Sequence, residues 1–158
     1  MRKITPCLWF DGDAEQAAEF YVSVFKDGKI TSVTRAGGGG MNDPGSVLAV
    51  SWEVQGQAFS GLNGGPQFPF TEAVSFQINC SDQAEVDHYW SSLTAGGGSE
   101  VQCGWCKDRF GLSWQVVPNR LYELLSDKDP GVVTRVTEAM MQMIKLDQGQ
   151  LEAAAAAT

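Results

Sequence analysis

The chain carries the same strand-then-helix pattern twice, 69 residues apart. The first copy is ITPCLWFDGDAEQAAEFYVSVF and the second is AVSFQINCSDQAEVDHYWSSL. In each copy an aspartate, Asp13 or Asp82, can cap the helix, and a glutamine or glutamate three residues later completes a capping box. The alternative is chance similarity between two amphipathic helices, but the shared cap, aromatic doublet and preceding strand favour an internal duplication. The matching helical residues are Phe20 and Tyr89, Tyr21 and Trp90, and Val24 and Leu93.

Three strand-like runs follow each predicted helix, so each half predicts a β-α-β-β-β module and the fold class is α+β. Gly56 lies in a two-residue hairpin between two runs of the first half. The Gly-rich segments 36–45 and 95–98 predict flexible connections, because no Lys-Ser/Thr pair and no helix follows them as in a phosphate-binding loop. The six runs cover residues 29–35, 46–54, 57–63, 99–103, 105–107 and 112–117.

The last part of the chain reads as helical and follows neither module pattern. PNRLYELLSDKD predicts a short helix, and the segment from Pro130 onward predicts one longer helix with that proline near its first turn. The apolar stripe of this longer helix is typical of core or of a subunit contact, and the alanine run predicts a frayed end. We expect one domain over residues 1–158, with module 1 over about 1–66, module 2 over about 67–118, C-terminal helices over 119–150 and a tail over 151–158.

The charge balance excludes two classes of partner. The net charge is −8 and the isoelectric point about 4.5, whereas nucleic acids and anionic membranes are bound by clustered Lys and Arg. No apolar run approaches the roughly 20 residues of a membrane-spanning helix. The start of the chain reaches acidic residues too soon for a signal peptide, so a cytoplasmic location is the default expectation.

Histidine and cysteine are too sparse to predict a zinc site. Without an export signal we expect free thiols at Cys7, Cys80, Cys103 and Cys106. Cys103 and Cys106 form a single CxxC, but zinc would need two further ligands, and a redox pair usually opens a helix rather than preceding a glycine turn and a strand. The single histidine, His88, is expected to be a partly exposed helix residue.

The stretch CGWCKDRFGLSWQVVP, residues 103–118, predicts a strand with a glutamine in its middle. Leu112, Trp114 and Val116 alternate with Ser113, Gln115 and Val117, which gives one apolar and one partly polar face. Two readings of Gln115 remain open. It is either a hydrogen-bonding group in a ligand cleft or an amide bonded to neighbouring main chain or water.

Four motifs carry a resemblance to a known family. They are FDGDAEQAAEFYVSVF, GLNGGPQFPF, CGWCKDRFGLSWQVVP and AMMQMIKLD, and they extend through nearly the whole chain. With the paired modules, they make the chain similar to the vicinal oxygen chelate superfamily of glyoxalase I, the extradiol dioxygenases and the bleomycin resistance proteins. Within it, the chain resembles the PhnB-like branch labelled 3-demethylubiquinone-9 3-methyltransferase. Cys106 departs from the pattern, since an apolar residue such as leucine is expected there in relatives.

The resemblance implies that each module curls its mixed sheet into a cup with the helices on the outer face. Metal enzymes of the superfamily take their ligands from four inward positions, which fall here at about Thr5, Ser60, Ser75 and Gln115. Hydroxyl and amide groups are poor ligands for divalent transition ions, so we expect no bound metal and no other cofactor. The methyltransferase label implies a Gly-rich turn for S-adenosylmethionine, and the sequence has no strand–GxGxxG–helix.

We expect the cup to bind a small molecule, because it combines aromatic surface with a few amides and hydroxyls. The first hypothesis is a metal-free binding protein with an unknown ligand. The alternative is an enzyme acting on a small aromatic or quinone-like substrate, with Cys7 or an added metal supplying the chemistry; a purely structural role is the third option. A homodimer is expected from the superfamily habit of pairing modules. The expected lining is Thr5, Cys7, Trp9, Ser60, Asn63, Ser75, Gln77 and Gln115, with Asn79 and Ser113 by alternation, and with Trp52 and Asn63 at the rim.

Overall fold

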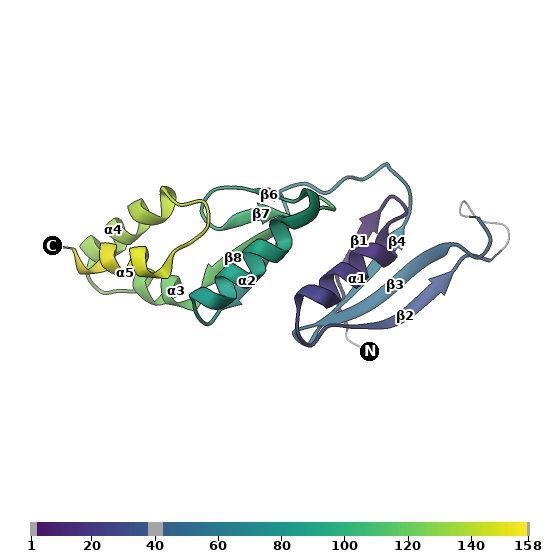
Figure 1. Cartoon of the computed structure of the whole chain (residues 1–158), viewed down its shortest axis with the longest axis horizontal. Helices are drawn as coiled ribbons and strands as arrows, with labels where there is room; N and C mark the ends of the chain where they lie inside the picture. The colour runs from purple at the N-terminus through teal and green to yellow at the C-terminus, as the bar shows by residue number, and fades with distance from the viewer. Residues whose placement is uncertain (1–2, 38–42, 158) are drawn as a thin grey trace. The chain divides into compact units, whose positions relative to one another are not determined.

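The computed structural model describes residues 3–37 and 43–157, and the chain divides into two compact units, one ending at Phe70 and one beginning at Thr71. Each unit has a four-stranded mixed sheet with a helix packed on it (Figure 1). None of the helices in the described ranges is long and apolar enough to cross a membrane. The expected α+β fold of two modules is confirmed.

Unit 1 has the sheet order β1-β4-β3-β2, with β1 parallel to β4 and the other neighbours antiparallel. The turn between β3 and β4 is the expected two-residue hairpin. Gln55 and Gly56 both have positive φ, 47° and 67°, as a type I′ turn requires. The Asp27 carboxylate accepts hydrogen bonds from Gln55 N (3.0 Å) and Gln55 Nε2 (2.9 Å), which helps to hold this turn. The elements are β1 (Cys7–Phe10), α1 (Ala14–Val24), β2 (Lys29–Arg35), β3 (Val47–Val54) and β4 (Gln57–Asn63).

The core of unit 1 lies between α1 and one face of the sheet. Trp52 of β3 stacks on Tyr21 of α1 (5.7 Å between ring centroids) and on Phe59 of β4 (5.6 Å). The expectation that Trp52 sits at the rim of a pocket was wrong. Side chains alternate along a strand, and Ser51 and Glu53 take the opposite face, so Trp52 points towards the helix and is 1% exposed.

Unit 2 repeats the topology of unit 1, with the sheet order β5-β8-β7-β6 and β5 parallel to β8. The repetition of sheet order and strand direction supports the internal duplication. β6 ends at Glu100 instead of continuing to residue 103, because Cys103 has a positive φ of 59° and its N–H donates to Met143 O (2.8 Å). The elements are β5 (Ser75–Cys80), α2 (Gln83–Thr94), β6 (Ser99–Glu100), β7 (Trp105–Lys107) and β8 (Ser113–Pro118), with a short 3₁₀ turn, η1 (Ala95–Gly97), after α2.

The two aspartates that were expected to cap the module helices behave differently. Asp82 accepts a hydrogen bond from Glu85 N (2.9 Å), and the Glu85 carboxylate accepts from Ser81 N (2.8 Å), one residue before the cap, so a variant of the predicted capping box forms. Asp13 makes no capping bond with its side chain. Its backbone is not extended (φ −108°, ψ 19°), and Asn63 Oδ1 accepts from Ala14 N (2.9 Å) instead. The predicted box at Asp13 was therefore wrong.

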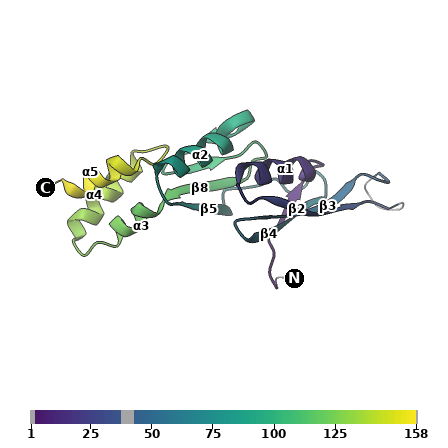
Figure 2. The ribbon, with the colours of Figure 1, turned by 60° about the horizontal axis from the view of Figure 1, so that its bottom comes forward.

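The C-terminal residues form three helices around a small apolar core (Figure 2). The predicted single helix from Pro130 was wrong, because the chain breaks between Met141 and Gln148. Asp147 caps the new helix by accepting from Gln150 N (2.8 Å). The helices are α3 (Asn119–Leu125), α4 (Pro130–Met141) and α5 (Gln148–Ala156), so the expected boundary between helices and tail at residue 150 falls inside α5.

Gly104 lets the break after α4 dock against the sheet of unit 2. Its N–H donates to Ile144 O (2.8 Å), next to the bond from Cys103 to Met143. Its φ is +81°, and a Cβ atom there would lie 2.9 Å from Leu146 Cδ1. Glycine is therefore required here both by the backbone conformation and by the close approach of the C-terminal segment.

Candidate functional site

In unit 1 the face of the sheet opposite α1 carries several of the expected lining residues. Cys7 and Ser60 are register partners on β1 and β4, and Trp9 lies two residues further along β1. Cys7 is exposed, whereas Trp9 and Ser60 are half-buried. Leu8 and Phe10 alternate with them and are buried on the helix side. Thr5 precedes β1 and is exposed.

The GLNGGPQFPF motif positions the Trp9 ring. A Cβ atom on Gly64 would lie 2.1 Å from Trp9 Cζ2, so only glycine leaves room for the indole. Trp9 Nε1 donates to Gly65 O (2.7 Å), and Phe68 packs edge-on against the ring at 5.0 Å between centroids. The motif therefore presents a fixed, half-buried aromatic surface on this face.

Asn63 does not lie with Cys7 and Trp9, contrary to expectation. It is 6% exposed and belongs to the buried, helix-side set of β4. Its side chain joins two segments, because Oδ1 accepts from Ala14 N and Nδ2 donates to Val47 O, both at 2.9 Å. The amide holds the start of α1 to the start of β3 and is occupied by main chain.

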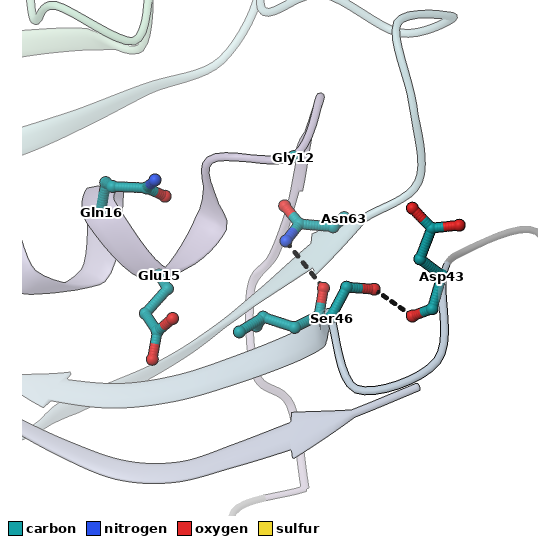
Figure 3. A pocket seen from close by; sticks show the side chains of 7 residues that line it. Gly12, Glu15, Gln16, Asp43, Ser46 and Asn63 are labelled. Carbon is teal, nitrogen blue, oxygen red and sulfur yellow. Dashed lines mark hydrogen bonds between the residues drawn. The ribbon is translucent and has the colours of Figure 1, made fainter. Parts of the chain in front are cut away.

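A cavity of about 340 Å³ adjoins the start of α1 (Figure 3). Asn63 forms part of its wall, and Ser46 Oγ donates to Asp43 O (2.6 Å) on another side. The hydrogen bonds drawn in Figure 3 join wall residues to one another, and the wall includes two carboxylates. The cavity therefore disfavours an anionic ligand. The lining residues are Gly12, Glu15, Gln16, Asp43, Ser46, Val47 and Asn63.

In unit 2 the sheet face opposite α2 presents a second group of expected residues in two cross-strand rows. The first row is Ser75 on β5, Ser113 on β8 and Lys107 on β7. The second row, one step along the strands, is Gln77, Gln115 and Trp105. Ser75, Gln115 and Trp105 are half-buried, Gln77 and Asn79 are exposed, and Ser113 is buried.

Gln115 uses one of its hydrogen-bonding groups on a neighbouring strand. Its Nε2 donates to Ser75 Oγ (2.9 Å), so the partner is a side-chain hydroxyl and not main chain. Its Oε1 has no partner among residues 3–37 and 43–157. Gln77 Nε2 donates to Asn79 Oδ1 (3.0 Å) and also contacts the Tyr122 hydroxyl, whose pKa is raised by burial. The hydroxyl and amide side chains on this face therefore hold one another in place by hydrogen bonds.

Lys107 is the only charged strand residue on this face in the part of unit 2 that the structure describes. Its ammonium forms an ion pair with Glu72, which lies in the segment leading into β5. The hydrogen bond and charge of Lys107 lower the pKa of Glu72. Between the two strands that the pair connects, Ser113 is 1% exposed, and its Oγ has no hydrogen-bond partner among the described residues.

Asp108 organises the turn between β7 and β8 and was missed in the sequence. It is 2% exposed, and its Oδ1 accepts from Phe110 N (2.9 Å) and Leu112 N (3.1 Å). Its Oδ2 accepts from Trp114 Nε1 (2.8 Å). The signal was present in the motif KDRFGLSW, where an acidic residue stands between two strand-like runs and precedes a Phe-Gly turn. The carboxylate fixes the start of β8 and with it the row that contains Ser113.

The cysteines are free, and two of them are buried thiols of low reactivity. Burial raises the pKa of Cys80 and of Cys106 to about 12, so both are neutral thiols at physiological pH. Cys106 is the register partner of Trp114 on the helix side of the sheet, while Cys103 lies outside the strands with its Sγ 3.8 Å from Met141 Sδ. The two cysteines of the CxxC motif therefore lie in different environments, Cys106 buried in the sheet and Cys103 half-buried in a loop.

The donors on these faces do not fit a divalent transition ion. The four positions implied by the family carry three hydroxyls and one amide, at Thr5, Ser60, Ser75 and Gln115, whereas such ions are held by imidazole, thiolate or carboxylate. His88 is exposed on α2 with its ring 5.0 Å from Tyr89. Over 3–37 and 43–157, no three His, Cys, Asp or Glu side chains form a group that could hold a metal.

Comparisons with known proteins identify the family of the chain. The family model described as 3-demethylubiquinone-9 3-methyltransferase matches residues 2–117. A solved structure titled putative 3-demethylubiquinone-9 3-methyltransferase, PhnB protein, from Bacillus cereus is 30% identical with a TM-score of 0.67, covering 74% of this chain and 99% of that one. Protein PA1353 from Pseudomonas aeruginosa is 21% identical with a TM-score of 0.61, covering 75% and 98%.

A more distant structure shares the fold alone. The fosfomycin resistance protein FosX from Listeria monocytogenes is 16% identical with a TM-score of 0.51, covering 74% of this chain and 93% of that one. Its title names Mn(II) and dihydroxypropylphosphonic acid as bound groups. No curated protein matches the chain.

Proposed function

The chain belongs to the 3-demethylubiquinone-9 3-methyltransferase family, a PhnB-like branch of the vicinal oxygen chelate superfamily, and from this premise we propose that it binds a small organic molecule without a metal ion. The observation that carries the proposal is the division of each sheet into two unlike faces. The helix side is apolar and closed, whereas the opposite side presents an indole together with hydroxyl and amide groups. Such a mixture suits a small aromatic ligand.

The proposed ligand-contacting residues come from both units. Trp9 supplies an aromatic surface in unit 1, next to Cys7 and Ser60, and Thr5 lies before the same strand. In unit 2, Gln115 supplies a carbonyl oxygen that has no partner among the described residues, beside Ser75 and Gln77.

The methyl transfer in the family description is not part of the proposal. S-adenosylmethionine usually binds a Gly-rich turn between a strand and a helix. In the described part of the chain, two strand-to-helix junctions contain a turn, Asp11-Gly12-Asp13 after β1 and Ser81-Asp82 after β5, whereas α3 follows β8 directly. Neither turn offers the closely spaced glycines that bring main chain against a charged cofactor.

Tryptophan fluorescence tests ligand binding, because Trp9 and Trp105 lie on the helix-free faces while the other three tryptophans are buried. A library of phenols, hydroxybenzoates and quinones is expected to contain compounds that quench the protein and whose effect shrinks in Trp9→Phe or Trp105→Phe. Gln115→Met should weaken such binding about tenfold, since it removes a hydrogen-bonding group. Gln102→Met, an exposed change in the same unit, is the matched control and should have no effect.

Two results would overturn the proposal. One is the absence of any quenching that depends on Trp9, Trp105 or Gln115. The other is about one equivalent of zinc, nickel or manganese per chain in protein purified without a His tag, measured by elemental analysis.

We also propose that the protein is a cytoplasmic homodimer without nucleic-acid or membrane partners. The free cysteines suit a reducing compartment. Met141 and Ile144, at the end of α4 and just after it, are 53% and 50% exposed, and apolar side chains of this kind are common at subunit contacts. Sizing chromatography at high protein concentration is expected to give twice the monomer mass of 17.1 kDa, and a monomer would contradict this part.

A further inference from the structure

We propose that the Ser75–Ser113–Lys107 row is a subsite for the carboxylate of a small ligand, and that Glu72 occupies it when no ligand is bound. The inference rests on the proposed small-molecule function and adds the chemical class of the ligand. It starts from Ser113, whose buried hydroxyl has no partner among the described residues. Such a group is costly to bury unless another state of the protein uses it.

The register gives the neighbours of Ser113 on this face. It begins β8, between Ser75 on β5 and Lys107 on β7, and cross-strand neighbours on one face lie close together. Lys107 extends from one side of this row to Glu72, three residues before Ser75 on the other side. The ion pair thus joins β7 to the segment leading into β5, across the row that contains Ser113.

The chemistry of the row matches a carboxylate. An ammonium and two hydroxyls can donate to its oxygens, and Gln115 holds Ser75 Oγ through a bond of 2.9 Å. Glu72 already places a carboxylate against Lys107, so the protein contains its own example of the group that this lysine accepts. The chain as a whole carries a net charge of −8, which repels anions. A single cation on an otherwise neutral face therefore marks the place where an anionic group can bind.

The ion pair is weak enough to be exchanged. The side chains of Lys107 and Glu72 are 33% and 63% exposed, and ion pairs at such positions contribute little to stability. A ligand carboxylate that replaces Glu72 keeps the charge pair with Lys107 and also gives the Ser113 hydroxyl an acceptor. Glu72 therefore acts as an internal competitor, and it returns to Lys107 when the ligand leaves.

The experiment compares benzoate with benzyl alcohol, its neutral analogue, on the full chain. Binding is followed by Trp105 fluorescence and by amide chemical shifts of residues 105–115. Glu72→Gln is expected to tighten benzoate binding about tenfold, and Lys107→Met to weaken it at least about tenfold, while benzyl alcohol responds to neither change. A gain of affinity in Glu72→Gln cannot result from misfolding. Ser113→Ala should weaken benzoate binding severalfold.

Charge-matched variants separate the local effect from net charge. Glu138→Gln on α4 and Lys128→Met before it change the same charges at exposed positions and should leave both affinities unaltered. Equal binding of benzoate and benzyl alcohol, or benzoate binding that ignores Glu72→Gln and Lys107→Met, overturns the carboxylate subsite and leaves small-molecule binding intact. Failure of benzoate to bind any variant also overturns the subsite. Failure of the whole aromatic library overturns the proposed function as well.

Discussion

Asp108→Ala is expected to lower the free energy of unfolding by about 3–5 kcal/mol. The carboxylate accepts from the main chain of Phe110 and Leu112 and from the Trp114 indole, at 2.8–3.1 Å. Alanine would remove the acceptor of these three donors, two of which are buried, and each buried donor left without this acceptor costs about 1–3 kcal/mol, partly relieved by relaxation of the turn. Urea denaturation followed by circular dichroism measures the loss.

Two further variants test the cause of this loss. Asp108→Asn keeps one carbonyl oxygen for the main-chain donors, so it should cost clearly less than alanine. Asp11→Ala, at an exposed position, is the control for removal of a carboxylate and should change stability by less than about 0.5 kcal/mol. If Asp108→Ala behaves like Asp11→Ala, the carboxylate does not hold the turn.

Trp52→Ala is expected to cost about 3–5 kcal/mol of stability, while Trp9→Ala should cost about 1 kcal/mol. Trp52 is buried between Tyr21 and Phe59, so its removal leaves a large cavity beneath α1. Trp9 is half-buried, so removal of its ring leaves less unfilled space. Thermal and urea unfolding of the two variants give the comparison.

The same pair separates core from binding face. Trp9→Ala should keep the fold and lose the quenching by aromatic compounds, whereas Trp52→Phe, which keeps a ring in the core, should retain that quenching. Equal destabilisation by Trp9→Ala and Trp52→Ala would show that the Trp9 ring belongs to the core and would remove it from the proposed site.

The features that were correctly predicted depend on neighbours in sequence. The capping box at Asp82 joins residues that are at most four positions apart, and the Gln55-Gly56 turn needs two adjacent residues that accept positive φ. The alternation along β8 separates Trp114 from Gln115 in the same local way. Periodicity and capping rules describe such short-range interactions well.

The errors at Asp13 and after Pro130 share a different cause, which is a partner far away in the chain. Asn63 replaces the Asp13 side chain as the cap of α1 from 49 positions away. The helix predicted from Pro130 breaks where Met143 and Ile144 bond to the loop at Cys103 and Gly104. No local pattern contains these partners.

The sequence by itself determined the two β-α-β-β-β modules, the face of β1, β5 and β8 that turns from the helix, and the hydroxyl and amide groups at Thr5, Ser60, Ser75 and Gln115, because alternation and residue chemistry are local properties. Only the tertiary structure decided that Trp52 belongs to the core, that Asp108 holds a turn and that Glu72 meets Lys107 over the buried Ser113. Those contacts exist because strand pairing and helix packing bring distant residues together, and spacing in the sequence does not encode such distances.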